Sequence, residues 1–404
     1  MTIFHLRVSL LPALLCSLLA LVFVGCNNED PDEMDEPEVQ VSETLDCNFF
    51  ATGEDIVLED KGLAVDYIID CPATLLSSRL TIEPGVTIEF TAESGLRILD
   101  AGALVAQGTA EDPIVLTAVD KIAGAWKGVY IESANVVNRL DYVTISYGGG
   151  AAFNSNDNKG NLIIAPLGGI SVDHCTLSHS ATYGFNIVSE ADIPVFTNNT
   201  LTDNDKPAIA YASEMHHFDA TTTFAGNTND YVEILCSFYE TGDYTIRKLD
   251  VPYRILAANF GLTRALKVPD NTNLTIEPGV RMVFTDDTGI ETDRGSSFRA
   301  VGTPSEPIVF TAVNELAGAW RGIEVSFSQS VNNLIDHAEI RYAGAGENGS
   351  AIYMWAEPRL TVSNTLIADI DGCAFRTPAD PFDNPNFTDT NVTTERLSGG
   401  VKCP

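Results

Sequence analysis

The sequence LTIEPGV spans residues 80–86 and returns letter for letter at residues 274–280. The two stretches are 194 positions apart. Further phrases repeat at the same offset: IVLTAV at 114–119 with IVFTAV at 308–313, and GAWKG at 124–128 with GAWRG at 318–322. The chain therefore contains an internal duplication, and a duplication of this kind determines the architecture.

The repeated phrase predicts two short strands joined at a corner. Apolar and polar residues alternate on both sides of the turn, which is the pattern of half-buried strands. The apolar positions are Leu80, Ile82, Val86, Ile88 and Phe90. Between the arms, Pro84 and Gly85 occupy the central positions of a type II turn, because Pro fixes φ and Gly accepts a positive φ.

Similar short strands recur at intervals of roughly seven to twelve residues, which fits a sandwich, a barrel or a solenoid of stacked coils. Two observations favour the solenoid. The Asn-Gly and Asp-Gly turns of tight hairpins are rare. Strand phrases also recur along the chain, as in ISVDHCTL at 170–177 and LTVSNTLI at 360–367.

These phrases resemble those of the right-handed parallel β-helix proteins of the pectin-lyase-like superfamily, and more narrowly the bacterial surface lipoproteins with this fold. The resemblance covers residues 80–218 and 274–387. It implies an all-β, right-handed parallel β-helix in two tandem units. Many relatives with this fold cleave acidic polysaccharides, so the resemblance also implies a polysaccharide lyase or glycoside hydrolase as one alternative.

We divide the chain into four segments: a lipoprotein signal peptide at 1–25, an acidic flexible tether at 26–45, a first cap and β-helix unit at 46–230, and a second cap and unit at 231–404. Caps are expected at 46–78 and 231–273, because an exposed end coil invites pairing with other strands.

The second unit is expected to be shorter than the first. After Phe375 its sequence contains Pro378, Pro381 and Pro385, where the first unit has strand phrases. We therefore expect the second unit to have lost a coil.

The N-terminus predicts export. Arg7 precedes an apolar run at 8–24 that Pro12 interrupts, so the run is short for a membrane span and is typical of a signal peptide. The phrase FVGC at 23–26 resembles the lipobox of bacterial lipoproteins, which implies cleavage before Cys26 and acylation of its thiol. An ordinary cleaved secretory signal is the alternative.

The segment at 27–38 is acidic, contains two prolines and has few apolar residues, so it predicts a flexible tether. Its acidic start also resembles the signal that sends some lipoproteins to the outer face of the outer membrane. We expect a lipid-anchored protein of the outer membrane at the cell surface, with the periplasmic face as the alternative.

Charge limits the partners. The chain has 23 Lys and Arg against 56 Asp and Glu, a formal net charge of −33 that repels nucleic acid. The expected partners are the membrane, through the anchor, and a polysaccharide or other envelope proteins. We expect no cofactor. The loop at 154–160, with Asp157, resembles a calcium loop only loosely, because its Gly falls one place late and no bidentate Glu follows.

Six cysteines follow Cys26, and in an oxidising envelope they can pair in 15 ways. We prefer a disulfide between Cys47 and Cys71. Cys175 and Cys373 stand in strand-like runs, where we expect small buried core residues.

Candidate catalytic residues are few. Neighbouring coils could bring together a general acid and base from Asp173, His174, His179, Asp203 and Asp205. Solvated polar groups at coil edges are the alternative. At its outward strand positions the first unit has Asp141, Thr144 and Ser146. In the matching strands the second unit has His337, Glu339 and Arg341, so the duplication does not preserve a catalytic set.

Aromatic residues suggest recognition of sugars, because their flat apolar faces suit sugar rings. The candidates are Trp126, Tyr130, Trp320, Tyr353 and Trp355. For Trp126 and Trp320, which lie between glycines, a packing wedge at a coil corner is the alternative. The sequence therefore predicts a lipid-anchored envelope protein that binds glycan or a surface partner without catalysis, with a polysaccharide lyase or hydrolase as the alternative.

Overall fold

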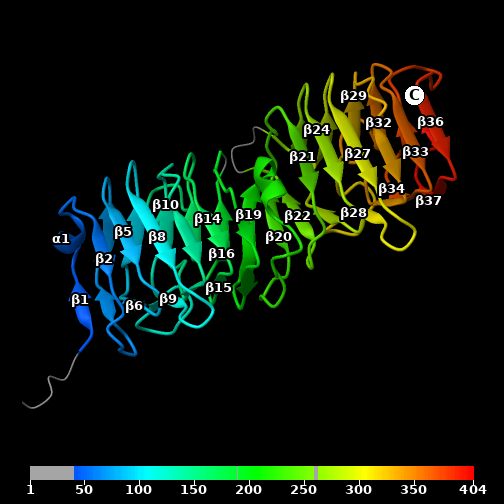
Figure 1. Cartoon of the computed structure of the whole chain (residues 1–404). Coiled ribbons are helices and arrows are strands. Elements are labelled where there is room, and N and C mark those ends of the chain that lie inside the picture. The colour runs from blue at the N-terminus through cyan, green and yellow to red at the C-terminus, as the bar shows by residue number, and fades with distance from the viewer. Residues whose placement is uncertain (1–40, 189, 259–262) are drawn as a thin grey trace, which may run out of the picture. The chain divides into compact units, whose positions relative to one another are not determined.

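The computed structural model describes residues 41–188, 190–258 and 263–404 (Figure 1). The predicted signal peptide, the acylated Cys26 and most of the tether lie outside these residues. The regular structure of the described chain is almost entirely strand, with one α-helix, α1 (Cys47–Phe50), and one 3-10 helix, η1 (Ala212–His217). Among the described residues, no helix combines the length and apolar character needed to span a bilayer.

The first repeat contains strands β1 to β19, which pair in parallel in three sheets. Sheet A contains β1 (Glu43–Leu45), β3 (Tyr67–Ile69), β6 (Thr87–Phe90), β9 (Ile114–Ala118), β12 (Val143–Ser146), β15 (Thr176–Ser178) and β18 (Thr200–Thr202). Sheet B contains β2 (Ile56–Leu58), β5 (Arg79–Ile82), β8 (Ala103–Gln107), β11 (Arg139–Asp141), β14 (Ser171–Asp173) and β17 (Phe196–Thr197). Sheet C begins with β4 (Pro72–Leu75), β7 (Gly95–Ile98), β10 (Val129–Ile131), β13 (Leu162–Ile164), β16 (Tyr183–Ile187) and β19 (Lys206–Tyr211).

The second repeat contains strands β20 to β38, one for each strand of the first. Sheet C continues with β20 (Val232–Leu235), β22 (Tyr253–Leu256), β25 (Arg281–Phe284), β28 (Ile308–Ala312), β31 (Ala338–Arg341), β34 (Leu366–Ile370) and β37 (Thr393–Leu397). Sheet F contains β21 (Asp243–Ile246), β24 (Asn273–Ile276), β27 (Ser297–Val301), β30 (Leu334–Asp336), β33 (Leu360–Ser363) and β36 (Phe387–Thr390). Sheet E contains β23 (Ala265–Val268), β26 (Gly289–Thr292), β29 (Gly322–Ser326), β32 (Ser350–Trp355), β35 (Cys373–Arg376) and β38 (Lys402–Cys403).

Successive coils stack in register, so the predicted right-handed parallel β-helix is confirmed. Leu80 pairs with Ile56 on one side and Leu104 on the other, and all three side chains are buried in one core. Burying a Leu or Ile side chain contributes about 1.5–3 kcal/mol, and each coil adds several. The corner after β5 is as predicted, with Gly85 at a φ of 86°.

The two repeats join without a break, but the second is rotated by one face. Sheet C runs through both repeats, and β19 pairs in parallel with β20. The 194-residue offset relates β6 in sheet A to β25 in sheet C, and β7 in sheet C to β26 in sheet E. The sheet C face of the first repeat is therefore continued by the counterpart of its sheet A.

Two expectations about the repeats need correction. Residues 43–45, which we assigned to the tether, form β1, because they pair with β3. The second repeat has not lost a coil after Phe375, since β36, β37 and β38 correspond to β17, β18 and β19. The prolines lie in the connection between β35 and β36, where no strand hydrogen bonds are needed.

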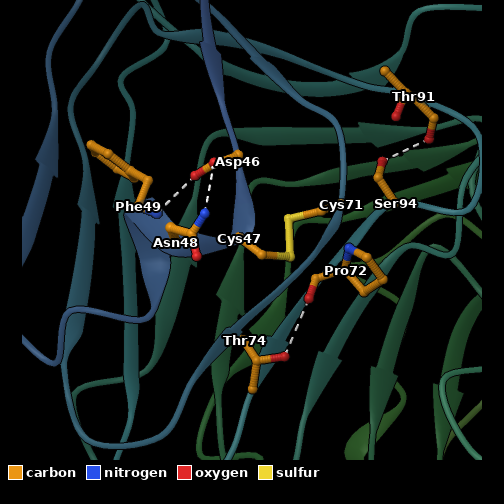
Figure 2. The surroundings of a disulfide bond; sticks show 9 residues. All are labelled: Asp46, Cys47, Asn48, Phe49, Cys71, Pro72, Thr74, Thr91 and Ser94. Atoms are coloured by element: carbon orange, nitrogen blue, oxygen red, sulfur yellow. Dashed lines mark hydrogen bonds between the residues drawn. A yellow bond between two sulfur atoms is a disulfide. The ribbon is translucent and has the colours of Figure 1, made fainter.

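A disulfide joins Cys47 to Cys71, the pair that the sequence favoured (Figure 2). It links α1 to the residue before β4. Asp46 caps the helix, since its carboxylate accepts a hydrogen bond from the Phe49 amide at 3.1 Å. Phe50 of α1 is buried in the core, so the helix packs against the first coils as a cap.

The second disulfide corrects an expectation. Cys373, expected as an unpaired core residue, is bonded to Cys403. The two residues lie on adjacent strands, β35 and β38, with their Cα atoms 6.1 Å apart. Cys175 and Cys236 are buried and are not in disulfides within the described residues.

We expect the double variant C47A/C71A to lose about 3 kcal/mol of stability, because the bond closes a loop with a sequence separation of 24. The loss should appear as faster amide hydrogen exchange in β1 to β4, since coils at the end of a solenoid open locally. The difference from wild type should vanish under reducing conditions. Equal exchange in oxidised wild type and variant would show that the bond does not hold the cap.

Candidate functional site

Asp173 and His174 lie at the corner between sheets B and A. The Asp173 carboxylate lies 3.0 Å from His174 Nδ1 and accepts hydrogen bonds from Thr197 Oγ1 at 2.7 Å and Asn198 Nδ2 at 3.0 Å. Partial burial acts to raise the pKa of Asp173, but these hydrogen bonds outweigh it and lower that pKa. The hydrogen bonds at this corner therefore favour the ionised form of the Asp173 carboxylate.

The same arrangement recurs in the second repeat at a coil that does not correspond. Asp336 lies 3.0 Å from His337 Nδ1 and accepts hydrogen bonds from Ser363 Oγ at 2.7 Å and Asn364 Nδ2 at 2.8 Å. Asp336 ends β30, the counterpart of β11, whereas Asp173 ends β14. The motif therefore occurs at two corners that the duplication does not relate, which supports the structural alternative for Asp173 and His174.

The other three catalytic candidates lie at the next corner, between sheets A and C. His179 and Asp203 both have a positive φ, at 57° and 58°, and occupy this corner in successive coils. Asp205 is engaged by Lys206 Nζ at 3.0 Å and by Asn229 Nδ2 at 2.8 Å. Strand β15 separates this corner from His174, so the structure does not gather the five residues into one site.

Trp126 and Trp320 are fully buried, so the prediction that they face sugar is wrong for both. Trp126 stacks on Phe90 at 4.0 Å and Trp320 on Phe284 at 4.1 Å between ring centroids. Each indole nitrogen donates a 2.7 Å hydrogen bond to a backbone carbonyl, of Ser146 and Arg341 respectively. The packing alternative therefore describes them.

Tyr130 is also buried, because a loop covers the outer face of sheet C in the first repeat. The loop, residues 147–161 between β12 and β13, places Phe153 beside Tyr130 at 5.6 Å between centroids. The Tyr130 hydroxyl donates to Glu132 and accepts from Asn154, each at 3.0 Å. Burial, reinforced by Glu132, raises the pKa of Tyr130 to about 12. The prediction of Tyr130 as a sugar-binding residue is wrong for this reason.

Asp157, the calcium candidate, lies in the same loop. Its carboxylate is 2.9 Å from Lys159 Nζ, so a cation of the chain already faces it. The described part of the chain holds no group of three or more His, Cys, Asp or Glu side chains placed to bind a metal ion.

The corresponding face in the second repeat is open. There the connection between β31 and β32 is only residues 342–349, which are too few to fold over the sheet as residues 147–161 do. Two hollows, of about 410 and 340 Å³, share Glu291 and Glu324. We call this surface the sheet-E face, defined by Phe238, Lys267, Glu291, Arg321, Glu324, Phe327, Tyr353 and Trp355.

Charged side chains line the sheet-E face at the spacing of the strands. Lys267, Glu291, Glu324 and Tyr353 are paired positions on β23, β26, β29 and β32. Glu291 forms ion pairs with Lys267 at 2.7 Å and with Arg321 at 3.2 Å.

Glu324 has neutral partners instead. Its carboxylate accepts from Ser326 Oγ at 3.0 Å and Asn348 Nδ2 at 3.4 Å. Burial raises the pKa of Glu324, and the nearby charge of Glu291 adds to the rise. Two adjacent carboxylates therefore stand in different environments.

Aromatic rings flank these charges. Trp355 is 43% exposed, Phe327 37% and Phe238 58%. Tyr353 lies 6.3 Å from Trp355 between centroids, and Lys267 Nζ lies 5.6 Å from the centre of the Phe238 ring. Trp355 is thus the one predicted aromatic that the structure leaves well exposed.

Sequence reasoning missed Glu291, Glu324, Phe238 and Phe327. The sequence did contain a sign of this site. At the 194-residue offset, Glu291 aligns with Arg97 and Glu324 aligns with Tyr130. The connection that covers the face is also visibly shorter in the second copy. Both differences show that the two copies have diverged at this face.

A larger hollow, of about 710 Å³, lies on sheet C beside the junction of the repeats. Of its two carboxylates, Glu233 is buried and already accepts a 2.6 Å hydrogen bond from Tyr183, and Asp157 faces Lys159 at 2.9 Å. Its aromatic residues, Tyr183 and Tyr211, are only partly exposed. The sheet-E face offers both exposed rings and available charge, so we take it as the candidate site.

Residues 54–185 match the family model described as a pectate-lyase-like β-helix domain. This part of the chain is similar to a pectate-lyase-like β-helix domain. The matched residues run from before β2 into β16, so the sheet-E face lies beyond them. A search of curated proteins found no match, and a search of solved structures found none.

Proposed function

We propose that this pectate-lyase-like β-helix binds glycan through the sheet-E face. The observation that carries the proposal is the contrast between the two copies. In the first, a loop and Phe153 seal the face. In the second, Trp355, Phe327 and Phe238 are exposed around a charged hollow.

The chemistry of the face suits a sugar chain. Aromatic rings offer apolar faces to the C–H side of a sugar ring, while carboxylates and cations pair with its hydroxyls. Glu291, Glu324 and Trp355 stand on stacked strands about 4.8 Å apart, which hold them rigidly before binding. A rigid site loses little entropy when a ligand binds.

Trp355→Ala is expected to weaken glycan binding at least tenfold, because an aromatic anchor at a binding site is typically worth 2 kcal/mol or more. The measurement is retention of the purified chain on an array of neutral, acidic and amine-bearing glycans. Phe49→Ala is the matched control, since Phe49 on α1 is 37% exposed but lies outside the sheet-E face. Equal loss in both variants, or no loss in W355A, would contradict the assignment of the site.

A second candidate function is hydrolysis of the bound glycan. Glu291 and Glu324 are neighbours on paired strands, and only Glu324 lacks a cationic partner. Two carboxylates in contrasting environments are the usual apparatus of glycoside hydrolysis. Glu324 would give a proton to the glycosidic oxygen as the bond to the anomeric carbon breaks. Glu291 would take a proton from the water that adds to that carbon, so the products are two sugars for one water consumed.

If the chain hydrolyses its ligand, Glu324→Gln should abolish the release of reducing ends while the variant is still retained on the array. Activity should fall as the pH rises through the raised pKa of Glu324, because the acid form is the donor. The assay follows reducing ends from a glycan retained on the array. Glu339→Gln, on β31 of sheet C, is the control. Retention without turnover by the wild type would leave binding as the function.

We also propose that Cys26 anchors the protein in the outer membrane at the cell surface, with residues 27–40 as spacer. The support is the lipobox-like phrase FVGC at 23–26 and the acidic segment that follows it.

Cys26→Ser is expected to move the protein from the membrane fraction to the soluble fraction, because no acyl chain can then be attached. Mass spectrometry of the wild-type N-terminal peptide should show acylation at Cys26, and Cys175→Ser should remain in the membrane fraction. A wild-type N-terminus cleaved elsewhere and carrying no lipid would support the ordinary secretory signal instead.

A further inference from the structure

The larger hollow of the sheet-E face contains more negative than positive charge. Its lining includes four carboxylates and one guanidinium: Asp287, Glu291, Glu324 and Glu347, with Arg321. The ionic partners are unevenly distributed among these carboxylates. Asp287 is bonded to Arg264, and Glu291 has both Lys267 and Arg321. Among the described residues, Glu324 and Glu347 form no ion pair.

The cations around the hollow are already engaged. Arg321 and Lys267 face Glu291, and Arg264 faces Asp287. Arg376, which pairs with Tyr353 on the next strand, donates to the backbone carbonyls of Asn348 at 2.8 Å and Pro404 at 2.7 Å. None of these four cations forms an ion pair with Glu324 in the described chain.

The lack of an ion pair has its largest effect on Glu324. It is half-buried, and its bonds to Ser326 and Asn348 are to neutral donors. Burial makes the ionised carboxylate costly and raises the pKa of Glu324, and the charges of Arg321 and Lys267 act in the opposite direction without cancelling that rise. A ligand cation placed here would offset that cost.

We propose that the glycan bound by the sheet-E face bears an amino group, whose ammonium lies against Glu324 within reach of Glu347. This inference rests on the proposed function and names its ligand class. A polyuronate would bring further carboxylates to a face where two carboxylates have no ion pair, on a chain with a net charge of −33. A neutral glycan would leave Glu324 without a directly paired cation.

The test compares three probes on the full chain: chitosan oligosaccharides, the same oligosaccharides fully N-acetylated, and oligogalacturonate. We expect the amine-bearing probe to bind roughly tenfold or more tightly than its acetylated form, as one charge-assisted hydrogen bond would give. Oligogalacturonate should not bind. Glu324→Gln should remove the preference, so that the amine-bearing probe binds no more tightly than the acetylated probe. Glu339→Gln should change neither.

Equal affinity for the free and acetylated probes, or binding of oligogalacturonate, would overturn the inference and leave glycan binding intact. Tighter binding of poly-L-lysine than of chitosan oligosaccharides would also overturn it, because the cation would then belong to a polypeptide. Failure of every glycan to bind, with W355A no different from wild type, would instead contradict the proposed function itself.

Discussion

In-register stacking of inward apolar side chains is the constraint on which this molecule depends. Each inward residue, such as Leu80, lies between the inward residues of the coils before and after it. A coil that slipped by one residue would turn its whole apolar set to solvent. The same constraint fixes the outward side chains, because a residue that faces outward on one strand faces outward beside its partner on the next. Glu291 and Glu324 are adjacent for this reason alone.

The connections between strands are under no such constraint, and they decide what each face can do. Residues 147–161 bury Tyr130 and close one face, whereas residues 342–349 leave its counterpart open. Packing of the core stabilises both repeats, so a connection can lengthen or shorten without disturbing the stacked coils. Function in this fold therefore depends on which loops are absent as much as on which residues are present.

The sequence predicted the strands, the turn at Gly85 and the parallel solenoid, because alternation and turn chemistry are local. It left Trp126 open between sugar contact and packing at a corner, since the stacking on Phe90 that buries it joins residues far apart in the chain. It placed Cys373 in the core, because nothing local indicates that β35 and β38 bring Cys373 beside Cys403. The site was missed for a related reason. Exposure of Glu324 is decided by a connection elsewhere in the sequence, and a single strand phrase does not contain that information.

The one-face rotation between the repeats means that duplicated surfaces do not line up along the axis. The covered face of the first repeat continues into the counterpart of sheet A, and its true counterpart, sheet E, looks in another direction. A straight polymer lying along the solenoid cannot follow both copies of the same surface. The duplication therefore did not lengthen one continuous groove. It added a second surface that faces another direction, and the residues on that surface could change independently of the first.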